Sequence, residues 1–163
     1  MTDSGLSHLN EHGEARMVDV TAKDVTTRSA TARCRVSVSE EVARLLESGD
    51  LPKGDALAVA RIAAIQATKR TPDLIPLCHP IAVHGADVHV SLQHGDEGSY
   101  VQVLATVRTA DRTGVEMEAL TAAAVGGLTV IDMVKGKDRS AAIDEVVLLE
   151  KLGGRSGHWV REE

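Results

Sequence analysis

A cysteine and a histidine stand together where an apolar run of the chain ends. The segment LIPLCHPI, residues 74–81, contains Leu77, Cys78 and His79, followed by Pro80. Proline disfavours the helical conformation for the residue before it, so the chain at His79 is extended or turning. Three interpretations of this pair are open: half of a metal site, a packed structural corner, or one wall of a substrate pocket.

A metal site would require ligands at suitable spacings, such as Cys-x₂-Cys followed by a second pair. The only other cysteine, Cys34, falls in a predicted strand. His84, His89 and His94 recur every five residues, but an odd spacing on a strand directs successive side chains to opposite faces. We therefore expect no metal site, while the structural corner and the pocket wall both stay open.

A long apolar segment, VEMEALTAAAVGGLTVIDMVKGK (115–137), carries charged residues near both of its ends. Asp132 and Lys135 are three positions apart, so on a helix they share a face and can form an ion pair. Glu118 lies on roughly the same stripe, about 21 Å before Asp132 along a helix. The two carboxylates therefore serve two ends of a long ligand or different pockets in an oligomer. A solvated helix edge is the alternative, which the apolar middle of the segment disfavours.

Two further segments could bind anions. Lys53, in LPKGDAL, stands at the entrance of a predicted helix, where free N–H groups attract anions and a lysine adds positive charge. A surface lysine in a turn is the alternative. The segment KLGGRSG (151–157) could cradle a phosphate, but it lacks the Gly-Lys-Ser/Thr ending of a Walker motif. Neither signal alone specifies a ligand.

The elements that would position these residues alternate between strands and helices. Caps mark two of the helices: Ser39 and Asp55 at N-termini, and Gly49 as a stop. Gly126 and Gly127 lie inside the last helix, where close backbone packing would explain them. Strands are predicted over 32–39, 86–94, 100–109 and 143–152, and helices over 39–49, 55–70 and 115–137. This order predicts an antiparallel α+β sandwich.

Composition limits the class of protein. The 163 residues suggest one domain, and aromatic residues make up only 1% of the chain, so the core must be Ala, Val, Leu and Ile. Such a core buries little area per side chain, and a subunit interface would help to complete it. The net charge of −6 and the few aromatics disfavour nucleic-acid binding. The sequence has no uncharged apolar run of 18 residues and no recognisable signal peptide, which favours a cytoplasmic protein. With only two cysteines in such a protein, free thiols are expected rather than a disulfide.

Four segments together resemble the MoaC family, the cyclic pyranopterin monophosphate synthases of molybdenum cofactor biosynthesis. They are MVDVTAKDVTTR (17–28), KGDALAVARIAAIQATKRTPDLIPLCHPI (53–81), TGVEMEALTAAAVGGLTVIDMVK (113–135) and LLEKLGGRSG (148–157). The resemblance implies one catalytic domain over 17–157, between a mobile arm at 1–16 and a tail at 158–163. It implies a ferredoxin-like α+β fold, an antiparallel sheet packed against two long helices. It also implies a homo-hexamer of dimers with active sites built at subunit interfaces.

The resemblance also implies roles for individual residues. Lys53, Asp132 and Lys135 match the family's catalytic lysines and aspartate. Residues implied to bind substrate are Leu77, Cys78, His79, Glu116, Met117 and Glu118, with less defined roles for Asp19 and Arg28. For the segment 74–81, the resemblance therefore favours the interpretation as one wall of a substrate pocket. After Asp132 the chain has Val134 and KGKDRS, where relatives often carry a cysteine and a different tail, so the loop after Lys135 has no predicted role.

The implied reaction converts 3′,8-cyclo-7,8-dihydro-GTP, supplied by a radical-SAM enzyme, to cyclic pyranopterin monophosphate and pyrophosphate. Acid/base rearrangement of the rings and attack of a sugar hydroxyl on the α-phosphate suit lysines, which transfer protons and stabilise phosphate charge. The chain lacks a cysteine cluster for an iron–sulfur centre, so the radical step belongs to another enzyme. We expect no cofactor, with Mg²⁺ assistance left open. A non-catalytic nucleotide-sensing module is the alternative function.

Overall fold

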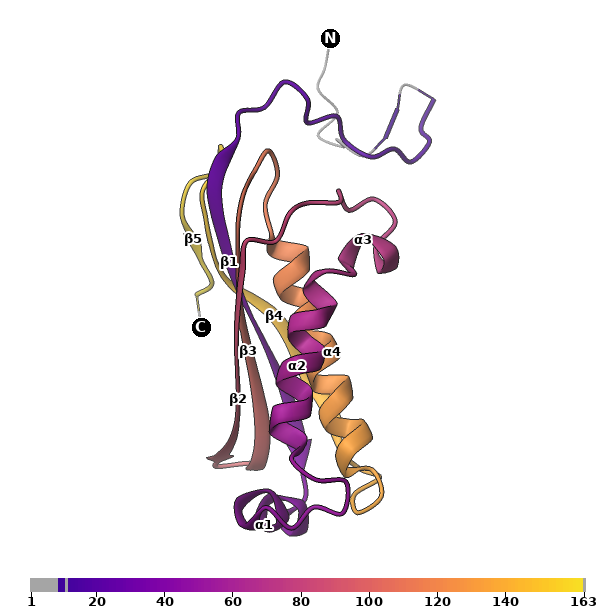
Figure 1. Ribbon diagram of the computed structural model, residues 1–163, viewed down its shortest axis with the longest axis vertical. Coiled ribbons are helices and arrows are strands. Elements are labelled where there is room, and N and C mark those ends of the chain that lie inside the picture. Colours follow the sequence, from indigo (N-terminus) through magenta and orange to yellow (C-terminus); the bar gives the residue numbers. More distant parts are fainter. Residues whose placement is uncertain (1–8, 11, 163) are drawn as a thin grey trace.

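A computed structural model describes residues 9, 10 and 12–162 of the chain. One antiparallel sheet has two long helices lying side by side over one of its faces (Figure 1). The strands are β1 (Thr26–Val38), β2 (Gly85–Gly95), β3 (Gly98–Asp111), β4 (Ala142–Leu152) and β5 (Trp159–Val160). The helices are α1 (Glu40–Ser48), α2 (Ala56–Thr68), α3 (Thr71–Leu74) and α4 (Glu116–Val134).

The sheet order β2-β3-β1-β4-β5 confirms the predicted ferredoxin-like α+β fold. The two β–α–β halves, β1–α2–β2 and β3–α4–β4, are joined by the β2–β3 hairpin, and every neighbouring pair of strands is antiparallel. Helix α2 packs against α4 and β2, while α4 packs against β1, β3 and β4. The two helices therefore close the core on one side of the sheet.

The core consists of small aliphatic side chains, as the composition predicts. Along β1, alternate residues from Ala30 to Val38 are buried under the helices, and the residues between them face the other side. The glycine pair of α4 allows the helix to approach the sheet. A Cβ atom on Gly126 would lie 2.8 Å from Cγ1 of Val103, and one on Gly127 would overlap Sγ of Cys34. The predicted close packing is confirmed.

Local signals placed most element boundaries correctly. Ser39 Oγ accepts a hydrogen bond from the Val42 N–H at 3.4 Å, and Asp55 Oδ1 accepts one from the Ala58 N–H at 2.9 Å. Gly49 ends α1 with a φ of 75°. Helix α4 ends at Val134, before the predicted 137, although the Lys135 N–H still donates to the Ile131 carbonyl at 2.8 Å.

Other segments differ from the predictions. β1 begins at Thr26 rather than at 32, because the Thr- and Ser-rich residues 26–31 alternate with too little hydrophobicity to indicate a strand. α3 was not predicted, and β5 pairs with β4 inside the segment predicted to be a tail. Of the predicted arm, residues 1–8 and 11 lie outside the described residues. Residues 12–16 are exposed, and Ala15 pairs with Leu9 in an isolated bridge.

Helix α4 is long and apolar enough to cross a membrane by length and composition alone, but half of its most apolar window is buried inside the protein. It packs on three strands and on α2. Its apolar character is therefore that of a core helix.

Candidate active site

A pocket of about 370 Å³ lies at the N-terminal end of α4. The segment after α3 supplies Leu77, Cys78 and His79 to its wall, and the first turn of α4 supplies Glu116 and Met117. These two segments, far apart in the sequence, are brought together as the resemblance implied. The remaining lining residues are Val18, Val20, Lys23, Thr113 and Gly114. We call this cavity the His79 pocket.

The N-terminal segment of the domain lies against the His79 pocket. His79 Nε2 is 2.6 Å from the carbonyl oxygen of Val18, and because a carbonyl only accepts, this nitrogen carries the proton. Asp19 is exposed, and it is not among the residues lining the described pockets. Its carboxylate accepts the Thr21 N–H at 2.8 Å, and hydrogen bonds from Thr21 lower its pKa. The structure thus gives Asp19 a part in a turn and does not bring it to the pocket wall.

Glu118 is buried directly behind the pocket wall, with 1% of its surface exposed. Its Oε1 accepts a hydrogen bond from the Cys78 thiol at 3.6 Å, and its Oε2 has no partner within the described residues. Burial raises the pKa of Glu118. Burial, with the Glu118 charge next, raises the pKa of Cys78 to about 11. The thiol therefore stays protonated at neutral pH and acts as a donor rather than as a thiolate nucleophile.

Glu116 is held by residues that the sequence did not single out. Lys151 Nζ of β4 donates to Glu116 Oε1 at 3.2 Å, and both side chains are mostly buried. A Cβ atom on Gly114 would overlap the Glu116 carboxylate, so glycine at this position leaves room for the carboxylate where it lies. Lys151 lies in the segment 148–157 that resembles the family, but in a strand whose alternation of side chains does not mark any one lysine as functional. No local signal in the sequence therefore identified it.

A second cluster lies at the opposite end of α4. Lys53 Nζ lies 2.6 Å from the Asp132 carbonyl oxygen and 3.2 Å from its Oδ2, while Lys135 Nζ lies 2.7 Å from Oδ1. Hydrogen bonds from Lys135 and then Lys53 lower the pKa of Asp132. All three side chains are about half exposed. We call this group the Asp132 cluster; its two lysines and one carboxylate present a net positive charge to solvent.

The two groups of predicted residues do not form one pocket within a single chain. Glu118 and Asp132 lie 14 positions apart on α4, which separates them by roughly 21 Å. The His79 pocket contains ring-sized space and hydrogen-bonding groups, whereas the Asp132 cluster contains the lysines that suit phosphate and proton transfer. The structure therefore places the predicted site residues in two groups, one at each end of α4.

Arg28 lies in a separate cavity of about 230 Å³ beside the His79 pocket. Its Nε donates to the Asp111 carbonyl at 3.0 Å and its Nη2 to the Arg112 carbonyl at 3.2 Å. Lys23 lines both cavities. Arg28 thus stands next to the predicted pocket without lining it.

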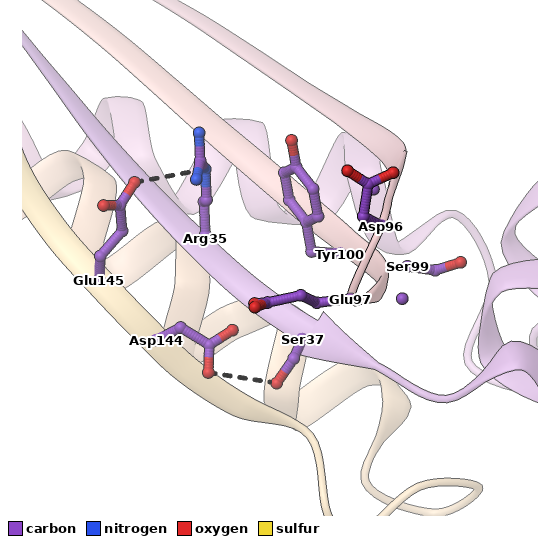
Figure 2. A pocket seen from close by; sticks show the side chains of 10 residues that line it. Arg35, Ser37, Asp96, Glu97, Ser99, Tyr100, Asp144 and Glu145 are labelled. Carbon is purple, nitrogen blue, oxygen red and sulfur yellow. Dashed lines mark hydrogen bonds and ion pairs between the residues drawn. The ribbon is translucent and has the colours of Figure 1, made fainter. Parts of the chain in front are cut away.

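A depression of about 670 Å³ lies on the other face of the sheet, and Figure 2 shows it. Arg35 points from β1 between Glu145, whose Oε1 is 3.3 Å from the arginine Nε, and the Tyr100 ring, whose centroid is 5.2 Å away. Four carboxylates line the depression: Asp96, Glu97, Asp144 and Glu145. None of the predicted site residues lines it, and its acidic character does not suit a polyphosphate substrate.

The similarity to known proteins covers nearly the whole chain. Cyclic pyranopterin monophosphate synthase of Streptomyces avermitilis is 58% identical over 96% of this chain and 89% of that protein. Proteins of the same name are 55% identical in a Nocardioides species, over 99% of each chain, and 52% identical in Thermomicrobium roseum, over 97% and 94%. Among solved structures, the designed protein Foldit4 matches with 17% identity, covering 79% of this chain and 99% of that chain. The TM-score of this match, 0.27, is too low to support any argument. The model of the MoaC family matches residues 17–154. The chain belongs to the MoaC family.

Proposed function

We propose that this protein is a cyclic pyranopterin monophosphate synthase that acts in molybdenum cofactor biosynthesis. It converts 3′,8-cyclo-7,8-dihydro-GTP to cyclic pyranopterin monophosphate and releases pyrophosphate. Relatives of that name are matched over 89% and 99% of their own length. The observation that carries the proposal is the pairing of a ring-sized pocket behind His79 with a lysine-rich Asp132 cluster in the same chain.

The Asp132 cluster supplies the groups for the phosphate chemistry. Lys53 and Lys135 stabilise the charge that develops as a sugar hydroxyl attacks the α-phosphate and pyrophosphate departs. The same amines give and take protons during ring opening and ring closure. Asp132 receives hydrogen bonds from both lysines, so it orients them toward the ligand.

The His79 pocket supplies the groups that hold the rings. His79, Glu116 and the carboxyl of Glu118 behind the wall offer donors and acceptors to the heterocycle, and Leu77 and Met117 offer apolar contact. The Oε2 atom of Glu118 has no partner among the described residues, and a ligand N–H would be a suitable partner for this buried acceptor.

A complete active site forms when two chains bring opposite ends of α4 together. Exposed apolar side chains lie on the two long helices: Val59 is 44% exposed and Ile62 63% on α2, and Leu128 58% on α4. A two-fold axis near the middle of α4 would cover this face and place the Glu118 end of one helix beside the Asp132 end of the other. Such dimers associate into a hexamer in this proposal.

The enzyme works in the cytoplasm, and a radical-SAM enzyme supplies its substrate. The reaction transfers no electrons, so it needs no redox cofactor. Dependence on Mg²⁺ is measured by adding a chelator to the assay described next.

The experiment is incubation of the purified protein with 3′,8-cyclo-7,8-dihydro-GTP, followed by chromatography of the pyranopterin product and an assay for pyrophosphate. Stoichiometric formation of both products is expected. Tight binding of the substrate without any product would instead identify a nucleotide-sensing module.

A further inference from the structure

We propose that Asp138 is a positioning residue: its carboxylate anchors the turn after α4 and so holds Lys135 beside Asp132. This turn, residues 135–141, joins α4 to β4, and the family resemblance predicted no role for it. That the held lysine serves the synthase reaction rests on the proposed function. The anchoring itself rests on the contacts of Asp138.

Asp138 is a buried carboxylate in an exposed turn. Only 6% of its surface is exposed, whereas its neighbours Lys137 and Arg139 are exposed. Its Oδ2 accepts the Ser39 N–H at 2.8 Å, and its Oδ1 accepts the N–H of Ser140 at 2.8 Å and the hydroxyl at 2.5 Å. A buried charge is stable only where donors surround it, so these contacts fix where the carboxylate lies.

Asp138 is charged at neutral pH. Hydrogen bonds lower its pKa, with the largest contribution from the Ser140 side chain and a smaller one from the Ser39 N–H. Both carboxylate oxygens therefore act only as acceptors. Because hydrogen bonds to an ionised group are stronger than those between neutral groups, these contacts hold the turn more firmly than ordinary backbone bonds would.

The backbone of the turn transmits this anchoring to Lys135. The carbonyl of buried Val134 accepts the N–H groups of Lys137 and Asp138, at 2.8 Å and 2.9 Å. The Lys135 ammonium lies 2.7 Å from Asp132 Oδ1, but an exposed ion pair alone contributes little to holding a side chain. The position of Lys135 therefore depends on the anchored backbone.

Asp138 also connects the segments that carry the two lysines of the Asp132 cluster. Its hydrogen-bond partner Ser39 is the N-cap of α1. Lys53 lies in the loop between α1 and α2, and Figure 1 shows α1 and the turn after α4 at the same end of the molecule. One carboxylate therefore fixes the segment of Lys135 relative to the segment of Lys53.

The test is steady-state kinetics of Asp138→Asn with 3′,8-cyclo-7,8-dihydro-GTP as the substrate. The amide fills the same space but has one acceptor oxygen instead of two, so the contact with Ser39 or that with Ser140 is lost. Because misplacing a catalytic group by about 1 Å costs up to about 100-fold in rate, we expect kcat to fall at least about ten-fold. KM should stay within about two-fold of wild type, because the variant leaves the His79 pocket unchanged.

Ser39→Ala is the matched control. It removes the side-chain cap of α1 but keeps the backbone N–H that Asp138 accepts, so it should lower the melting temperature and leave kcat unchanged. Equal losses of kcat in the two variants would assign the effect to a general loss of stability and overturn the positioning role. Wild-type kcat in folded Asp138→Asn overturns it as well.

Ser140→Ala replaces Asp138→Asn if circular dichroism shows that the latter does not fold. Ser140 is exposed, and its loss removes one donor to the same carboxylate. In this variant kcat should fall by a smaller factor than ten, and an unchanged kcat overturns the positioning role.

Hydrogen exchange of the peptide covering 133–141, followed by mass spectrometry without substrate, measures the anchoring independently of the reaction. The amides of residues 137 and 138 should exchange faster in Asp138→Asn than in wild type, but not in Ser39→Ala. A fall in kcat without faster exchange overturns the positioning role. A wild-type protein that forms product while Asp138→Asn keeps wild-type exchange and kcat refutes that role alone. Faster exchange in Asp138→Asn with no wild-type product refutes the proposed function alone.

Discussion

The Nζ atom of Lys53 lies 2.6 Å from the backbone carbonyl oxygen of Asp132, 79 positions later in the chain. This contact links the loop that enters α2 to the last turn of α4. The same nitrogen reaches the Asp132 carboxylate at 3.2 Å, on the other side of which Lys135 lies at 2.7 Å. One carboxylate therefore spaces two amines that would otherwise repel each other, and both amines face solvent.

Replacement of Lys135 by arginine separates charge from proton transfer. Arginine keeps the positive charge and much of the reach, but its guanidinium stays protonated under all relevant conditions. Lys135→Arg should still bind a non-reacting GTP analogue in calorimetry, yet lose at least ~100-fold in turnover, the low end of acid/base contributions. Lys137→Arg, in the exposed turn that follows, is the control. Near wild-type turnover would make Lys135 an electrostatic clamp and move the proton-transfer role to Lys53 or His79.

Gly127 is a site where a single methyl group should destabilise the fold. A Cβ atom there would overlap Sγ of Cys34, and overpacking costs about 1–3 kcal/mol. The higher helix propensity of alanine offsets up to about 1 kcal/mol of this loss of stability. We expect Gly127→Ala to lower the free energy of unfolding by about 1–2 kcal/mol in urea titrations. Gly136→Ala is the control, since a Cβ atom there meets no atom of the described structure within 4 Å.

The fold could be predicted because local signals agreed with one another. Ser39, Gly49 and Asp55 mark helix ends by their own hydrogen-bonding and conformational preferences, and each does so in the structure. The first half of β1 could not be predicted, because its inward residues are as small as Ala30 and its outward ones are Thr and Ser. α3 contains Pro72 at its start, a residue compatible equally with a turn.

The candidate site was predictable only in part. Spacing on one helix was enough to pair Asp132 with Lys135, but nothing local indicates that Lys53 reaches the same carboxylate. Lys151 and Lys23 acquire their positions from strand register and from a turn, which only the folded chain defines.

Glu118 should make the stability of the protein depend on pH. Burial raises its pKa in the folded state above the ordinary value of 4.5. The native state then binds the proton more tightly than the unfolded state, so stability is greatest below the unfolded pKa and falls as pH rises through the folded pKa. Glu118→Gln keeps an acceptor for the Cys78 thiol and removes this titration. Urea unfolding from pH 5 to pH 8 should show the variant gaining stability relative to wild type. A parallel pH dependence in both proteins would contradict the assignment, and exposed Glu41→Gln is the control.

Mixing two inactive variants should restore activity if the site is shared between chains. His79→Ala disables the pocket at one end of α4, and Asp132→Asn disables the cluster at the other. In a dimer with antiparallel α4 helices, a mixed pair has one site with both changes and one site with neither. Random mixing makes about half of the dimers mixed, so about a quarter of wild-type turnover should return after joint unfolding and refolding. Refolding each variant alone gives the baseline, and light scattering reports the assembly. If turnover stays at that baseline while the chains mix, each site is complete within one chain, and the proposed two-fold arrangement is wrong.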